Sequence, residues 1–436
     1  MSGVKASLHV VPVRTTMKPE LRPLATYGRD IPGPRGEAPA KNRRGHSRGG
    51  RGFGWKRPGL PCLERSDVAG SLRVSGARPI PSRESGVIVF GELLQAQRPL
   101  AALGRQMMDT MLHDKHGRQI TDLRISVTDR CNFRCVYCRS ADPENCHDES
   151  EILTWAELDR LARIFVALGI RKIRVTGGEP LVRNGVEGYI ARLRALGVRD
   201  VSMTTNGHLL AERCDRLVKA GLHRINISLD SLDPVKFERI TRTKSFDVVM
   251  KGIEAAQNSA LRPAKVNAVL VRGLNDDEVE AFAAFARERG LIMRFIEFMP
   301  LDADRHWTRS LVVPAAEIHR RIDAQWKLEQ IPHERSETAR KYRFADGAPG
   351  EIGLIAPVTQ PFCGFCSRVR LTADGKLRTC LFSKEDHDLR DLLRGGASDE
   401  DVAFFIRSVI NEKEEGHRIN EPGFVPPSRT MVFIGG

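Results

Sequence analysis

From residue 121 onward, two hydrophobic periods alternate along the chain. Short β-branched runs typical of strands recur between longer segments whose apolar residues return every three or four positions, as in amphipathic helices. The predicted strands cover residues 123–128, 172–176, 200–205, 224–230, 265–271 and 292–299. Strands that alternate with helices need parallel pairing and right-handed crossovers, so the pattern predicts an α/β fold. Six units indicate an incomplete (β/α)6 TIM-like barrel.

Two of the predicted helices carry their own start and stop signals. Thr154 and Glu157 have the spacing of a capping box, and Gly169 is expected to end the helix that follows. A second helix is predicted to begin at Asn275, which has an acidic residue three positions on, and to end at Gly290. Both helices carry one apolar face that can cover a sheet.

One face of most predicted strands is polar, because side chains alternate along a strand. These faces carry Arg124, Ser126 and Thr128, then Lys172, Arg174 and Thr176, then Asn226, Ser228 and Asp230, then Lys265 and Asn267. They could be solvated faces of an antiparallel sheet. Since helices cover the outside of a parallel barrel, we favour a wet, cationic interior that holds a polar ligand.

The formal net charge of +14 is concentrated at the N-terminal end. Residues 1–85 hold 17 Lys and Arg against 6 Asp and Glu, and the stretch is rich in Gly and Pro. We interpret residues 1–106 as a disordered basic leader. It is either a nucleic-acid-binding arm or, as we favour, upstream sequence outside the working protein, because Met107, Met108 and Met111 precede the first well-patterned segment.

The chain lacks a run of about 18 apolar residues, so we expect no membrane partner and a cytoplasmic protein. Its nine cysteines are an odd number and include two triplets, which does not suit a secreted disulfide framework. The triplets are Cys131, Cys135 and Cys138, and Cys363, Cys366 and Cys380.

Three thiolates leave one iron of a 4Fe-4S cluster open to a small ligand. The alternative for the first triplet is a structural zinc site completed by Cys146 or His147, and for the second a zinc ribbon that lacks one ligand. The first triplet follows the first predicted strand, where the active sites of (β/α) barrels collect, so we favour a cluster there.

The run of residues 131–138, CNFRCVYC, resembles the signature loop of the radical S-adenosylmethionine (SAM) superfamily, and residues 177–180, GGEP, match a second motif of that superfamily. The resemblance implies a radical SAM partial barrel over residues 111–300. It also implies that an electron from the first 4Fe-4S cluster cleaves S-adenosyl-L-methionine to methionine and a 5′-deoxyadenosyl radical.

The second triplet is followed by Arg368 and Arg370, and the chain ends in Gly435-Gly436. With the run DLRISVTD at residues 122–129, these features resemble the GTP 3′,8-cyclase family of molybdenum cofactor biosynthesis. The resemblance begins near residue 111, so the leader has no expected counterpart. It implies that residues 301–436 form a C-terminal region with a second 4Fe-4S cluster and a Gly-Gly tail. Ser367 departs from the Asn of many relatives.

The resemblance also assigns residue roles. It places Tyr137, Gly178, Ser228 and Met299 at S-adenosyl-L-methionine, where Glu179 can accept a hydrogen bond from the ammonium group. It places Arg124, Arg174, Thr204, Lys265, Arg368, Val369 and Arg370 at GTP. It gives catalytic roles to the first cysteine triplet, Arg368, Arg370, Gly435 and Gly436.

The implied reaction converts GTP to (8S)-3′,8-cyclo-7,8-dihydroguanosine 5′-triphosphate. The implied partners are an external one-electron reductant, a downstream cyclic pyranopterin monophosphate synthase and a second copy of the chain in a homodimer. Two alternatives stay open at this stage. One is a peptide-modifying radical SAM enzyme with an auxiliary cluster, and the other is a nucleic-acid-binding iron-sulfur regulator that uses the leader.

Overall fold

A twelve-stranded sheet forms the centre of the computed structural model, which describes residues 111–140, 146–334 and 336–435. The predicted leader lies outside these residues. The strand order is β12-β11-β10-β1-β2-β3-β4-β5-β6-β9-β8-β7. The strands are β1 (Asp122–Ser126), β2 (Lys172–Thr176), β3 (Asp200–Thr205), β4 (Arg224–Ser228), β5 (Lys265–Leu270), β6 (Ile292–Glu297), β7 (Leu328–Ile331), β8 (Arg340–Phe344), β9 (Glu351–Ile355), β10 (Arg368–Leu371), β11 (Lys376–Arg378) and β12 (His387–Asp388).

All six predicted strands are present, and four of them end one or two residues earlier than predicted. Neighbouring strands from β10 through β1–β6 to β9 pair in parallel, whereas β7, β8, β11 and β12 pair antiparallel at the two edges. The strands after residue 300 therefore extend both edges of the sheet that β1–β6 begin. The described strands form an open row, in agreement with the predicted incomplete barrel.

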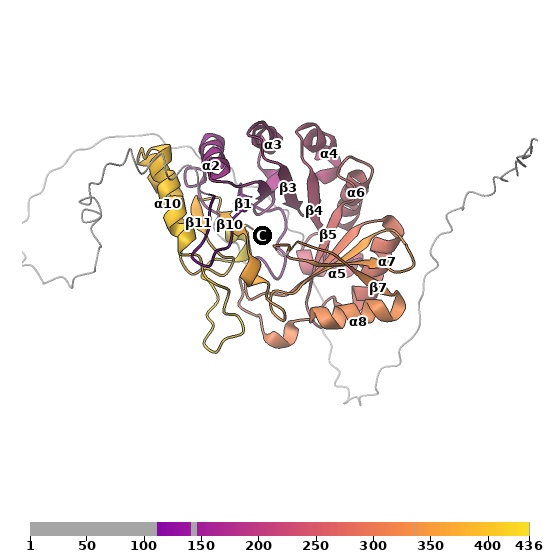
Figure 1. Ribbon diagram of the computed structural model, residues 1–436. Helices are drawn as coiled ribbons and strands as arrows, with labels where there is room; N and C mark the ends of the chain where they lie inside the picture. The colour runs from indigo at the N-terminus through magenta and orange to yellow at the C-terminus, as the bar shows by residue number, and fades with distance from the viewer. Residues whose placement is uncertain (1–110, 141–145, 335, 436) are drawn as a thin grey trace, which may run out of the picture. The chain divides into compact units, whose positions relative to one another are not determined.

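Most of the described helices lie between strands in the chain, and the last three follow the final strand. Figure 1 shows α2, α3, α4 and α6 outside the arc of β1, β3, β4 and β5, with α10 beside α2. The helices are α2 (Trp155–Ala167), α3 (Val186–Ala195), α4 (Leu210–Lys219), α5 (Pro234–Thr241), α6 (Phe246–Gln257), α7 (Val279–Arg289), α8 (Ala315–Gln325), α9 (Leu389–Arg394), α10 (Asp399–Asn411) and α11 (Met431–Ile434).

One predicted helix start is confirmed and the other is wrong. Thr154 and Glu157 form both hydrogen bonds of a capping box at the start of α2. Helix α7 begins at Val279, after a 3-10 turn, and Asn275 makes no capping bond. The amide of Asn275 instead bonds backbone carbonyls of Asp230 and Val269, because the side chain is buried between two strand ends.

The alternation of side chains separates the core from the interior of the barrel. Leu123 and Ile125 of β1 are buried under the helices, whereas Arg124 between them faces the other way and lines a cavity. None of the helices in the described part of the chain is long and apolar enough to cross a membrane. The inner face of the sheet is polar, and the candidate site lies on this face.

Candidate active site

A cavity of about 300 Å³ lies inside the arc of strands. It brings together both cysteine triplets, which are about 230 residues apart in the sequence. Its lining includes these predicted site residues: Cys131, Cys135, Tyr137, Cys138, Gly178, Thr204, Ser228, Met299, Cys363, Cys366, Cys380, Arg124, Arg174, Arg368 and Arg370. The sequence-based site is therefore one continuous space.

The first triplet lies on the loop that follows β1. Burial raises the pKa of the Cys131 thiol to about 11 and that of Cys135 well above its ordinary value, so these groups become thiolates only beside a metal charge. Tyr137 donates a 2.6 Å hydrogen bond to Asp230. Burial raises the pKa of Asp230 to about 6. The loop thus presents three thiols and a fixed tyrosine to the cavity.

Gly178 holds this loop by close backbone contact. A Cβ atom built on Gly178 would lie 2.4 Å from the carbonyl oxygen of Arg130, so no larger residue fits without a shift. The Gly178 and Glu179 amides donate to the carbonyls of Thr128 and Arg130. The glycine pair therefore serves the approach of two chain segments next to Cys131.

Glu179 is buried and already well supplied with donors. Its carboxylate accepts hydrogen bonds from the amides of Leu181 and Asn206 and from the Thr205 hydroxyl. Burial raises the pKa of Glu179 to about 7. Because three donors already occupy its two oxygens, a contact with the ligand's ammonium group stays a prediction.

The second triplet lies in a more cationic environment. Cys363 begins a short 3-10 turn (Cys363–Phe365) before β10, Cys366 directly follows the turn, and Cys380 follows β11. Burial alone would raise the pKa of Cys366, but Arg368 and Lys413 hold it below its ordinary value. Arg118 donates a 2.9 Å hydrogen bond to the Cys363 carbonyl and so fixes the turn.

The residues present fit iron-sulfur clusters better than zinc. The His147 ring, which could have completed a zinc site, faces the carboxylates of Asp129 and Asp374 at 2.9 and 3.8 Å. Within residues 111–140, 146–334 and 336–435, no group of three or more His, Cys, Asp and Glu side chains converges on a single-ion site. Thiols spread around a cavity suit a cluster, because each thiolate binds a different iron and the sulfurs need not converge on one point, and three thiols leave one iron open to a ligand.

The sheet register builds a row of arginines across the floor of the barrel. Arg124 pairs with Arg370 on one side and with Arg174 on the other, so three guanidinium groups lie on adjacent strands. A second cavity of about 100 Å³ lies against this row and is also lined by Lys172 and Arg368. This arrangement confirms the predicted cationic interior.

The cations on this floor depress one another's pKa values. Burial, Arg294 and Arg224 lower the pKa of Arg174 to about 9 and that of Lys265 to about 7. Burial and Arg224 lower the pKa of Arg294 to about 10. Since opposite charge would reverse these shifts, the floor is suited to bind a polyanion.

Two of these cations were missed by the sequence analysis. Arg294 lies on β6 and lines both cavities, and Arg224 begins β4 and lines the smaller one. The signal for Arg294 was its position between Met293 and Phe295, which are buried on the opposite face. The same alternation had identified Arg124 and Arg174.

Not every predicted contact lines the larger cavity. The Val369 side chain is fully buried in the hydrophobic core, so only its backbone is left for the predicted substrate contact. Lys265 is found among the floor cations rather than on the cavity wall. The Ser367 hydroxyl bonds the Asp122 carboxylate and its carbonyl accepts from two amides, so this departure from the family pattern is absorbed at the start of β10.

The C-terminal tail enters the same site. Gly435 has a φ of +84° and packs so closely that a Cβ atom would lie 2.9 Å from that of Ser126. Its carbonyl accepts a 2.8 Å hydrogen bond from Arg370. Gly436 lies outside the described residues. Arg370 thus holds the tail, whereas Arg368 stacks on Phe362 and lines both cavities.

Comparison with known proteins agrees with this geometry. Residues 125–286 match the radical SAM superfamily, and residues 291–419 match the family described as Molybdenum Cofactor Synthesis C. The chain is 44% identical to the GTP 3′,8-cyclase of Mycolicibacterium smegmatis over 386 residues, which cover 87% of this chain and 98% of that one. It is also 44% identical to the GTP 3′,8-cyclases of Streptomyces coelicolor, covering 75% and 96%, and of Thermodesulfovibrio yellowstonii, covering 74% and 100%.

The superfamily match and the cysteine loop at the end of β1 define the chain as a radical SAM enzyme, with S-adenosyl-L-methionine and an iron-sulfur cluster as cofactors. The relatives named above identify the family more narrowly than the superfamily match does. The chain belongs to the GTP 3′,8-cyclase family. The Mycolicibacterium match covers more of the chain than residues 111–436 provide, so for this relative the prediction that the leader has no counterpart fails. The Streptomyces and Thermodesulfovibrio matches cover only about the share of the chain that residues 111–436 provide.

Proposed function

We propose that this chain converts GTP to (8S)-3′,8-cyclo-7,8-dihydroguanosine 5′-triphosphate, the first step of molybdenum cofactor biosynthesis. The observation that carries the proposal is the single cavity that both cysteine triplets and the arginine floor share. A substrate that spans this space can meet a radical source at one end and an anion site at the other. GTP has both parts, a nucleoside and a triphosphate.

The triphosphate is assigned to the cationic floor. Arg124, Arg174, Lys265 and Arg368 hold it, and Arg294 joins them because it lies in the same cluster. The ligand carries about four negative charges, and guanidinium groups suit bidentate phosphate contacts. Thr204 lines the cavity and is assigned to the ribose end. This binding also relieves the repulsion among the cations.

The second triplet is assigned to a second 4Fe-4S cluster whose open iron faces the guanine base. Cys363, Cys366 and Cys380 line the cavity beside Arg368 and Arg370, which fits a base held next to its phosphates. The pKa of Cys366, which Arg368 and Lys413 lower, supports thiolate ligation at that residue.

The first triplet, Tyr137, Gly178, Ser228 and Met299 are assigned to the other end of the cavity. When bound there, the first cluster and S-adenosyl-L-methionine supply a carbon radical that can take a hydrogen atom from C3′ of the ribose. The protein's part is to orient and enclose the substrate. Asp230 fixes Tyr137 in the wall, and Gly435 with Arg370 closes the side next to Ser126.

An anaerobic assay tests the proposal. The reconstituted full chain is incubated with dithionite, S-adenosyl-L-methionine and GTP, and both methionine release and GTP loss are measured. We expect the two to be coupled and the product to carry the 3′,8 bond. Cleavage of S-adenosyl-L-methionine that never consumes GTP would contradict the proposed substrate.

Further partners follow from the same proposal. The cycle needs an external one-electron reductant, and the product is expected to pass to a cyclic pyranopterin monophosphate synthase. A homodimer and a cytoplasmic location stay predictions.

A further inference from the structure

The C-terminal tail reaches the cavity wall through a very short element. Helix α11 has four residues and is followed directly by Gly435. Gly435 must lie within a narrow space, since its Cα faces Ser126 and Thr176 and its carbonyl meets Arg370. The tail is also held by a 3.3 Å hydrogen bond from the Met431 amide to the Leu301 carbonyl and by the burial of Ile434, and the segment that leads into α11 has a further, charged anchor.

That anchor lies two residues before α11. The Arg429 guanidinium donates to both carboxylate oxygens of Asp374, at 3.0 and 2.8 Å, and its Nε donates to Asp386. The Arg429 and Asp374 side chains are only 18% and 5% exposed. A shielded, bidentate contact with a second carboxylate is far more restrictive than an ordinary surface ion pair.

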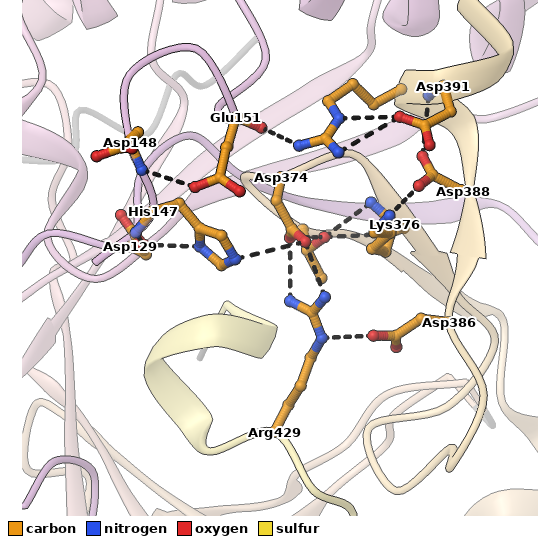
Figure 2. Close-up of polar contacts among 12 residues, drawn as sticks. Asp129, His147, Asp148, Glu151, Asp374, Lys376, Asp386, Asp388, Asp391 and Arg429 are labelled. Atoms are coloured by element: carbon orange, nitrogen blue, oxygen red, sulfur yellow. Dashed lines mark hydrogen bonds and ion pairs between the residues drawn. The ribbon is translucent and has the colours of Figure 1, made fainter. Parts of the chain in front are cut away.

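Asp374 also connects the tail to the loop of the first triplet. The ring Nδ1 and the backbone amide of His147 both donate to the Asp129 carboxylate, at 2.9 and 2.7 Å. The other ring nitrogen of His147 lies 3.8 Å from Asp374. Asp129 is two residues from Cys131. Figure 2 shows His147 between the two aspartates, with Arg429 approaching Asp374 from the segment that leads into α11.

The tail touches this connection directly as well. The Phe433 ring of α11 packs edge-on against the His147 ring, with 5.6 Å between centroids and an interplanar angle of 87°. The hydroxyl of Thr372 donates a 2.6 Å bond to Asp374, so the carboxylate that receives Arg429 is itself fixed in the turn after β10. The tail is therefore held at its start, its middle and its end.

We infer that Arg429 is a positioning residue, which with Asp374 and His147 fixes Gly435 in the cavity wall relative to the loop of Cys131. Arg429 is not among the residues that line either of the two cavities described above. Its effect on cyclisation rests on the proposed function, whereas its effect on the tail does not. If the substrate were wrongly assigned, the role of Arg429 in holding the tail could therefore still be tested.

The test compares matched variants of the anaerobically reconstituted full chain. Arg429→Gln removes the charge and the bidentate contact with Asp374, and Arg429→Lys removes the bidentate contact but keeps the charge. The control is Arg287→Gln, because Arg287 of α7 makes a bidentate pair with Asp346 at 2.7 and 2.5 Å on the surface. Amide hydrogen exchange is followed by mass spectrometry in peptides that cover residues 430–435 and in peptides from β10.

For Arg429→Gln we expect exchange in residues 430–435 to rise at least about tenfold, with β10 unchanged. Product formed per S-adenosyl-L-methionine cleaved should fall by a similar factor, and the KM for GTP should change little. Arg429→Lys should recover part of both, and Arg287→Gln should change neither. Asp374→Asn should reproduce the Arg429→Gln pattern.

Two results would overturn the inference. One is tail exchange in Arg429→Gln equal to that of the wild type. The other is a rise in exchange across all elements alike, which would mean that the ion pair supports the whole fold. If the wild type cyclises no GTP, the proposed function fails, and the exchange comparison still decides whether Arg429 holds the tail.

Discussion

The two cysteine triplets line the same cavity but lie in opposite electrostatic surroundings. Around the first, Glu179 and Asp230 add to the effect of burial and raise thiol pKa values, with Arg139 offsetting part of it at Cys131. Around the second, Arg368, Lys413 and Arg118 lower the pKa of Cys366. Three thiols thus lie near carboxylates at one end and three lie near cations at the other, although burial still raises the pKa values of Cys363 and Cys380.

This difference indicates which ligand each end prefers. S-adenosyl-L-methionine carries a sulfonium and an ammonium group, which suit the end with buried carboxylates, whereas a nucleoside triphosphate suits the end beside the arginine floor. The sheet makes the separation possible, because β1 supplies the first loop at its carboxyl end while β10, its parallel neighbour, follows the second.

The largest effects are expected from the cysteines. Cys131→Ser should abolish cleavage of S-adenosyl-L-methionine, because the first cluster loses a ligand. Cys363→Ser should abolish cyclisation, leave some uncoupled cleavage and lower bound iron by roughly half on a two-cluster count. Iron analysis and methionine release measure both. Identical losses in the two variants would mean that the triplets have no separate roles.

A substitution in the C-terminal tail should lower cyclisation nearly as much as the loss of a cysteine. Gly435→Ala places a methyl group 2.9 Å from the Ser126 Cβ in a backbone conformation with φ of +84°, so the tail must move. We expect a roughly hundredfold fall in cyclisation, since small displacements in an active site have effects of that size. Thermal unfolding should change little, because the tail is peripheral to the main core. Unchanged turnover would show that the contact with Ser126 is dispensable.

A smaller loss, in GTP binding, is expected from substitutions of the arginines that line the floor of the barrel. Arg368→Ala should weaken GTP binding more than about tenfold, or about 1.4 kcal/mol, because the guanidinium faces both cavities. Guanosine, which lacks phosphates, should bind the wild type and the variant almost equally. Equal losses for both ligands in a titration would instead assign Arg368 to the second cluster or the fold. Arg370→Ala should lose cyclisation as well, since Arg370 also holds Gly435.

The smallest effect is a pH dependence. Lys265 has a pKa lowered to about 7, so above pH 7 the free protein holds it neutral. A triphosphate favours the charged form, so binding takes up a proton and GTP affinity should fall as pH rises, by at most about tenfold per unit. When GTP affinity is measured by titration between pH 7.5 and 9, it should change less with pH in Lys265→Met than in the wild type. If affinity changed equally with pH in both proteins, the proton would be taken up by a group other than Lys265.

The strands were predictable because their signal is local. The bounds of β2 and β3 agree with the prediction, since alternating β-branched residues end there at turn residues. Four others were predicted too long at their carboxyl ends, where residues such as Asp230 keep the alternating pattern but leave the ladder to line the site. The inner-face arginines followed from the same alternation.

Contacts between distant segments could not be predicted from local pattern. Nothing in the sequence near residue 368 indicates that β10 pairs with β1, some 245 positions earlier, and that pairing is what places Arg370 next to Arg124. The contact of Arg429 with Asp374 depends on the same long-range packing. Asn275 was mistaken for a helix cap because its burial between strand ends has no local signature.

The most direct test of opposite ligand preference is electron paramagnetic resonance of the two single-cluster variants, each reduced and titrated with both ligands. In Cys363→Ser, which keeps the first triplet, S-adenosyl-L-methionine should change the spectrum and GTP should not. In Cys131→Ser, which keeps the second, GTP should change the spectrum and S-adenosyl-L-methionine should not. Spectra that respond to both ligands in both variants, or in the reverse order, would contradict the account.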